Sequence, residues 1–180
     1  MIRKFFILLI VSLFSSFYIF SQSLYLQDIG QNIPYLHVKF EWSQAEDASS
    51  YNFQISDSES FSSLVVDVTT NSLMYIDTDN INWGQLYYYR VADNASGVWS
   101  EVKSFSTDSK ISSATTQIID SSYNDDGLTI FGAYFDFYSA AIDKNGREIW
   151  HSVVPQSSYI GGMVYYSTDY YGNWYGLEYQ

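Results

Sequence analysis

The chain has 180 residues, a formal charge of -12 at pH 7, no cysteine, and aromatic side chains at 19% of its positions. The lack of cysteine excludes a disulfide scaffold, and the many aromatic residues exclude a disordered polyanion. An acidic surface repels phosphate groups, so nucleic acid is excluded as a natural partner. The length allows one ordinary domain and part of a second.

The N-terminus has the three parts of a secretory signal. A positive end at Arg3 and Lys4 precedes an apolar stretch over residues 5–20. A small-x-small cleavage site follows at residues 21–23. Because the apolar stretch is shorter than the roughly twenty residues that span a bilayer, it does not indicate a membrane anchor. We expect residues 1–23 to be removed and the product to be secreted or periplasmic, with no membrane span after cleavage.

From residue 35 onward, apolar residues recur at every second position, which is the period of a β-strand. Three such runs are separated by clusters of Ser, Asp, Asn and Gly that suit turns. Their apolar members are Leu36, Val38, Phe40 and Trp42; Tyr51, Phe53 and Ile55; and Tyr87, Tyr89 and Val91. No ten-residue window has the spacing of an amphipathic helix. The sequence therefore predicts an all-β fold whose strands bury one face.

Residues 24–107 resemble a fibronectin type III domain, through the runs VKFEW, SYNFQIS and INWGQLYYYRVADNASGVWSEVKSFST. The resemblance implies an immunoglobulin-like β-sandwich with Trp42 packed between its two sheets. It also implies that the Tyr87 hydroxyl reaches back to the preceding corner and that Trp99 lies in the turn into the last strand. The first strand departs from the family, because it lacks a proline-rich opening. Such a module serves as a spacer or docking platform.

Residues 108–123 are rich in Ser and Thr, and we expect them to form a linker. Beyond the linker, Asp143 ends one apolar run and a tight turn follows at residues 144–146. Trp150 closes the next run, four residues after Gly146. In blade-type repeats the aspartate accepts backbone amide hydrogen bonds in the turn, and the tryptophan fills the space between neighbouring blades.

The run DDGLTIFGAYFDFYSAAIDKNGREIWH resembles the start of a β-propeller of the arylsulfotransferase family. Quinone-dependent dehydrogenases share the aspartate, glycine and tryptophan, but the strand DGLTIF and the preceding sandwich favour the arylsulfotransferases. This resemblance implies an exported enzyme that transfers a sulfuryl group from a phenolic sulfate ester to a phenol. In bacterial members a histidine from a later blade is the nucleophile.

Residues 124–180 are enough for little more than one blade, whereas a propeller needs four to eight. We therefore expect the chain to be the N-terminal part of a longer protein, without the remaining blades and without a complete active site. No cofactor and no metal site are expected, since no metal-binding or phosphate-binding motif occurs. Residues 158–180 hold eight aromatic side chains. Strand packing and a carbohydrate-stacking surface both remain open for them.

Histidine is the usual acid-base residue, and the chain has two. His37 alternates with buried residues and is expected to face solvent. His151 is the one catalytic candidate that the sequence offers, although it does not match the nucleophile of the arylsulfotransferase family. Its position next to Trp150 predicts a side chain that faces outward. Two alternatives therefore stay open: a non-catalytic extracellular module that binds glycans or proteins, and a truncated dehydrogenase-type propeller.

Overall fold

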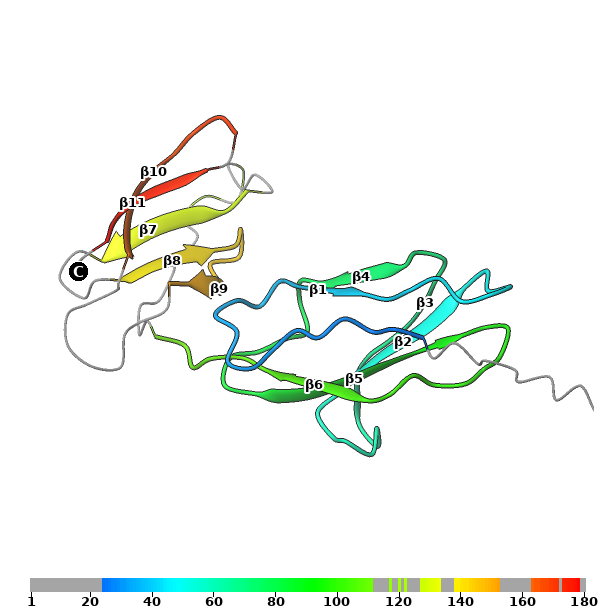
Figure 1. Ribbon diagram of the computed structural model, residues 1–180. Helices are drawn as coiled ribbons and strands as arrows, with labels where there is room; N and C mark the ends of the chain where they lie inside the picture. Colours follow the sequence, from blue (N-terminus) through cyan, green and yellow to red (C-terminus); the bar gives the residue numbers. More distant parts are fainter. Residues whose placement is uncertain are drawn as a thin grey trace, which may run out of the picture.

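A computed structural model describes residues 24–111, 117, 120, 122, 127–133, 138–152, 163–171 and 173–178. Within these ranges every extended regular element is a β-strand and no α-helix occurs, as the alternating apolar pattern predicts. The predicted signal, most of the predicted linker, and Asp126 of the predicted first blade lie outside the described residues. Figure 1 shows two groups of strands that meet near β9.

The first group, residues 24–107, is called the two-sheet unit. Its strands are β1 (Val38–Glu41), β2 (Tyr51–Ser56), β3 (Leu64–Thr70), β4 (Met74–Asp77), β5 (Leu86–Asp93) and β6 (Lys103–Ser106). β1 pairs with β4 in the smaller sheet, and the larger sheet has the order β3-β2-β5-β6, with all pairs antiparallel. The preceding segment adds isolated bridges from Leu26 to Trp42 beside β1 and from Ile33 to Thr107 beside β6.

Aromatic rings from both sheets form one core. Phe40 of β1 contacts Phe53, Tyr89 and Phe105 of the larger sheet, at centroid distances of 4.9, 5.1 and 5.6 Å. All four side chains are fully buried. A ring of this size removes about 150–250 Å² from water, which stabilises the fold by about 4–6 kcal/mol before the entropy cost.

The burial of the three predicted runs follows their alternation. Every apolar member of those runs is buried, while Lys39 and Asn52 on the opposite faces are exposed. His37 is half-buried and not fully exposed, because it lies beside the loop after β4 and the turn after β8. The alternating pattern thus identified β1, β2 and β5 and their inward faces.

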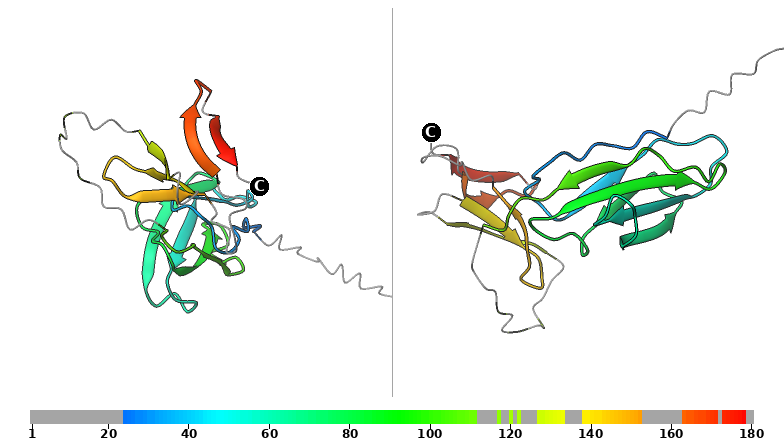
Figure 2. Two further views of the ribbon diagram at one scale, coloured as in Figure 1. Left: turned by 90° about the vertical axis from the view of Figure 1, so that its left-hand side faces the viewer. Right: turned by 90° about the horizontal axis from the view of Figure 1, so that it is seen from below.

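The second group begins with the C-terminal sheet, which has the order β7-β8-β9 and antiparallel pairing. Its strands are β7 (Thr129–Ala133), β8 (Tyr138–Ile142) and β9 (Glu148–His151). β10 (Met163–Thr168) and β11 (Trp174–Glu178) form an antiparallel hairpin. This hairpin lies against β7 and β8, as Figure 2 shows, and the backbone N–H of Tyr165 donates to the Ser139 hydroxyl at 2.6 Å.

Candidate functional site

The turn between β8 and β9 is organised by Asp143. Its Oδ1 accepts hydrogen bonds from the backbone N–H groups of Asn145 at 2.8 Å and Arg147 at 2.9 Å. Its carbonyl oxygen accepts a third from the N–H of Gly146 at 2.9 Å. Gly146 has a φ of 77°, a left-handed conformation that glycine adopts without a steric penalty. The hydrogen bond to Asp143 fixes the backbone of Arg147 at the end of the turn, and the Arg147 side chain extends away from the C-terminal sheet.

Arg147 connects this turn to the loop after β4. Its Nη1 donates to the carbonyl oxygens of Thr78 and Asp79, at 3.2 and 3.1 Å. Its Nη2 donates to the carbonyl oxygen of Ile81. A planar guanidinium with several fixed donors can satisfy these carbonyls together, which a lysine ammonium does less well. The side chain thus ties the C-terminal sheet to the two-sheet unit.

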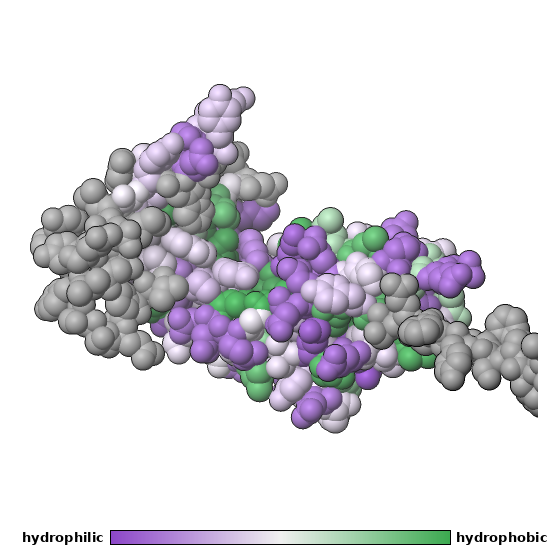
Figure 3. All heavy atoms as spheres, viewed as in Figure 1, coloured by the Kyte–Doolittle hydropathy of each residue, from purple (hydrophilic) through white to green (hydrophobic). Residues whose placement is uncertain are grey.

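The backbone of β9 makes a second connection. The N–H of Leu36 donates to the carbonyl of Ile149 at 2.8 Å, and the N–H of His151 donates to the carbonyl of Pro34 at 3.1 Å. An antiparallel bridge joins Tyr35 to Trp150 between these bonds. β9 is therefore paired with β8 on one edge and with residues 34–36 on the other. We call this region, with Arg147 and Trp83, the β9 junction; Figure 3 shows apolar side chains where the two groups meet.

His151 lies inside the β9 junction. Its side chain is 0% exposed, and its ring stacks on Trp83 with a centroid distance of 4.7 Å and an interplanar angle of 28°. Nδ1 lies 3.0 Å from the Ser152 carbonyl oxygen, which can only accept, so Nδ1 carries the hydrogen in this contact. Nε2 is buried without a hydrogen-bond partner among the described residues. The expectation that His151 faces outward is therefore wrong.

The burial of His151 follows from the Trp83 ring that covers it. Ile149 and His151 are two residues apart and both buried, whereas Trp150 between them is only half-buried. The pairing between β8 and β9 also shifts after Ala141, so that Trp150 faces Ala141, Glu148 faces Ile142 and Ile149 is an extra residue.

Glu148 is a second ionisable residue in the β9 junction. It is 5% exposed, and its Oε1 is buried without a hydrogen-bond partner in the described part of the chain. Its carbonyl oxygen accepts a hydrogen bond from the indole N–H of Trp83 at 2.9 Å. Burial raises the pKa of Glu148, because the charged carboxylate loses hydration; the nearby Lys110 and His151 counteract this in part.

The geometry argues against catalysis by His151. A general base or nucleophile must come within hydrogen-bond reach of its substrate, and a fully buried ring stacked on Trp83 cannot do so. A cavity of about 280 Å³ borders the junction, with His37, Asp79 and Lys144 among its lining residues, but His151 does not line it. The contacts in the β9 junction therefore support a structural role, which is to hold the two groups of strands together.

The described residues contain no group of three or more His, Cys, Asp or Glu side chains placed to hold a metal ion. No helix among them is long and apolar enough to cross a membrane.

The other residues singled out by sequence lie in the two-sheet unit. Trp42 is 4% exposed and stacks on Phe53, with centroids 5.3 Å apart. The Tyr87 hydroxyl accepts a hydrogen bond from the backbone N–H of Asn82 at 3.0 Å. The guanidinium of Arg90 lies 4.1 Å from the ring centroid of Trp99. The structure does not bring these three residues together with Asp143, Gly146 or Trp150 in one cluster.

Sequence reasoning missed Arg147 and Trp83, the two side chains that cross the β9 junction. Both contacts join residues more than sixty positions apart, so no local pattern contains them. The one available signal was a basic residue directly after a turn, in a chain with only eight Lys and Arg.

Comparison with protein-family models, with curated proteins and with solved structures finds no match to this chain.

Proposed function

We propose that this chain is the exported, non-catalytic N-terminal part of an arylsulfotransferase-like protein. In this proposal residues 24–107 are a fibronectin type III-like sandwich, and residues 124–180 begin a β-propeller. Three features support this assignment: the order of the strands in the two sheets, the hydrogen bond of the Tyr87 hydroxyl to the backbone of the preceding corner at Asn82, and the turn built on Asp143.

The β9 junction is the observation that carries the proposal. A flexible tether needs no contacts between the units that it joins, yet here Arg147, Trp83 and residues 34–36 all bond across the junction. Such contacts hold the two-sheet unit in a fixed orientation on the C-terminal sheet. The sandwich would then serve as a support for the propeller, whose later blades would supply the catalytic histidine.

The reaction proposed for the complete protein moves a sulfuryl group between two phenols. The bond between sulfur and the donor phenol oxygen breaks, a bond between sulfur and the acceptor oxygen forms, and the acceptor proton passes to the departing phenolate. With 4-nitrophenyl sulfate as donor and phenol as acceptor, the products are 4-nitrophenol and phenyl sulfate. Substrate and acceptor are thus phenolic sulfate esters and phenols, and no cofactor is required.

The test compares two purified proteins in the 4-nitrophenyl sulfate assay: the 180-residue chain and the product of the complete natural gene. We expect 4-nitrophenol release, dependent on added phenol, from the complete product alone. Release by the 180-residue chain would contradict its assignment as non-catalytic. A complete product that transfers no sulfuryl group but reduces a quinone dye with an alcohol would instead be a dehydrogenase-type propeller.

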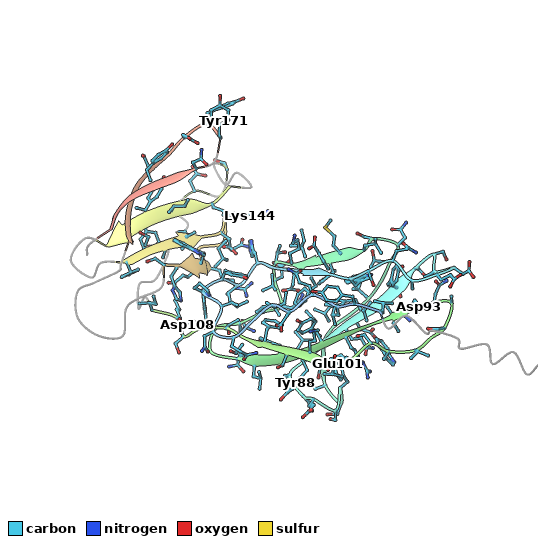
Figure 4. All side chains as sticks on the ribbon, in the orientation of Figure 1. Tyr88, Asp93, Glu101, Asp108, Lys144 and Tyr171 are labelled. Atoms are coloured by element: carbon cyan, nitrogen blue, oxygen red, sulfur yellow. The ribbon has the colours of Figure 1, made fainter. Side chains whose placement is uncertain are left out.

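A second candidate function is an adhesion module that binds a partner protein. It is favoured by Tyr170 and Tyr171 at the tip of the β10–β11 hairpin, which are 97% and 85% exposed. The Asp169 carboxylate holds this tip through the N–H groups of Tyr171 and Asn173, each at 2.9 Å. Figure 4 shows Tyr171 projecting from the hairpin. Exposed tyrosines are common anchors of protein interfaces, so loss of cell attachment in the Tyr170→Ala, Tyr171→Ala double variant would support this candidate.

A further inference from the structure

Asn145 lies in the turn between β8 and β9, and it is the only asparagine of the chain that is followed by a glycine. Its side chain is exposed and makes no hydrogen bond within the described ranges. Figure 4 shows the neighbouring Lys144 at the end of the C-terminal sheet that is nearer to the two-sheet unit. The side-chain amide of Asn145 can therefore rotate toward the backbone that follows it.

An asparagine in this position can react with its own backbone. The backbone nitrogen of Gly146 attacks the side-chain carbonyl carbon of Asn145, and a new C–N bond closes a succinimide ring. The bond from that carbon to the side-chain nitrogen breaks, and ammonia leaves with the proton of the Gly146 amide. Water then opens the ring at either carbonyl and leaves aspartate or isoaspartate. The step consumes water, releases ammonia and involves no oxidation or reduction.

The structure both permits and restrains this reaction. Gly146 has no side chain to crowd the ring that forms at its nitrogen. Its N–H, however, donates to the Asp143 carbonyl at 2.9 Å, and Asp143 Oδ1 accepts the N–H groups of Asn145 and Arg147. The attack requires the first of these bonds to break. Because exposed turns open at low free energy, the bonds should slow the reaction and not prevent it.

The products would alter the turn that carries Arg147. Isoaspartate leads the backbone through the side chain of residue 145, which lengthens it by one carbon–carbon bond of about 1.5 Å. Arg147 follows two residues later and donates to the carbonyls of Thr78 and Asp79 across the β9 junction. Both products also add a carboxylate to a cavity that Asp79 and Asp143 already line, and like charges repel. We propose that Asn145 is a deamidation site whose conversion to isoaspartate weakens the β9 junction.

Incubation of the purified protein at pH 7 and pH 8 tests this proposal. Proteolytic digestion with mass spectrometry locates each converted asparagine, and enzymatic methylation of isoaspartate counts that product. We expect Asn145 to convert before any other asparagine, at a rate that rises in proportion to the hydroxide concentration, because the attacking nitrogen must lose its proton. In urea, followed by tryptophan fluorescence, the converted protein should unfold at a lower midpoint than the fresh protein.

Two glutamine variants serve as matched controls. Asn145→Gln keeps an amide in the turn but would need a larger ring, so it should neither convert nor lose stability on incubation. Asn71 is likewise an exposed asparagine in a turn, between β3 and β4, and its side chain makes no hydrogen bond among the described residues, but it precedes Ser72. Asn71→Gln should leave the conversion of Asn145 unchanged.

Two further variants separate the parts of the argument. Asp143→Ala removes the acceptor of two of the turn N–H groups and should therefore speed the conversion. Asn145→Asp adds the carboxylate without the longer backbone. Its midpoint in urea should lie between those of the fresh wild type and the isoaspartate form.

Three results would overturn the proposal. Asn145 stays intact during an incubation that converts the free peptide Asp-Lys-Asn-Gly-Arg, which would mean that the folded turn blocks the reaction. Another asparagine converts first, which would place the labile site elsewhere. The isoaspartate form unfolds at the same midpoint as the fresh protein, which would mean that the turn does not affect the β9 junction. The proposal is independent of sulfuryl transfer, since none of these measurements involves a phenol or a sulfate ester.

Discussion

Replacing Arg147 by alanine tests whether the β9 junction joins the two groups of strands. The guanidinium donates to three backbone carbonyls of the loop after β4, and the contact with Ile81 is partly buried. Alanine removes all three hydrogen bonds. The exposed carbonyl oxygens can then bond to water, whereas the partly buried Ile81 carbonyl oxygen loses its partner. We expect the C-terminal sheet to separate from the two-sheet unit under milder conditions.

The magnitude follows from the exposure of the three bonds. A shielded hydrogen bond to a charged group contributes about 1.5–3 kcal/mol, whereas exposed ones contribute well below that. With one partly buried and two exposed bonds, the total is about 2–3 kcal/mol. At a urea dependence of about 1–3 kcal/mol per molar, the transition of the C-terminal sheet should move down by about 0.7–3 M urea.

Tryptophan fluorescence follows this transition, because Trp83 leaves its stack with His151 when the junction opens. Arg147→Lys keeps the positive charge but loses the planar set of N–H donors. Its midpoint in urea should therefore lie between those of the wild type and Arg147→Ala. Lys103→Ala removes one positive charge from β6 and serves as the control. If the free energies of unfolding of Arg147→Ala and Lys103→Ala agreed within about 0.5 kcal/mol, the structural role of Arg147 would be refuted.

Three further predictions concern single groups. Tyr87→Phe removes the acceptor of the Asn82 N–H and should lower the free energy of unfolding by about 1 kcal/mol, as measured in urea. Gly146→Ala places a Cβ in the left-handed region and should cost about 1–2 kcal/mol, seen as a lower melting temperature. Glu148→Gln should be more stable than the wild type at pH 7. Burial raises the pKa of Glu148 above its ordinary value of 4.5, so the wild type keeps its full stability below pH 4.5 and loses part of it as the pH rises through the folded-state pKa. Unfolding free energies between pH 4 and pH 8 should therefore fall for the wild type relative to the variant, and parallel curves would contradict the argument.

The strands β1, β2 and β5 and the core residues on them could be predicted from the sequence, because their signal is local. A strand that buries one face must alternate apolar and polar residues, and Phe40, Phe53 and Tyr89 each stand at the inward positions of such runs. The turn at Gly146 was equally local, since Asp143 and Gly146 lie within four residues of each other.

The β9 junction could not be predicted in the same way. The buried position of His151 depends on Trp83, which is far away in the sequence. The pairing of Tyr25 and Gln27 with the end of β1 was not predicted either, because no long alternating run marks residues 24–34. In both regions the decisive contacts are made between distant segments, and only the folded chain shows them.

The short segment from Ile33 to Leu36 has a consequence for the order of folding. Its first residue pairs with Thr107, beside β6, and its last residue donates to Ile149 of β9. Contacts between such distant parts of a chain form late, because a long loop must close first. During synthesis, residues 33–36 leave the ribosome long before β9, so their hydrogen bonds to β9 form last. Until then, pairing with the two-sheet unit keeps this segment extended.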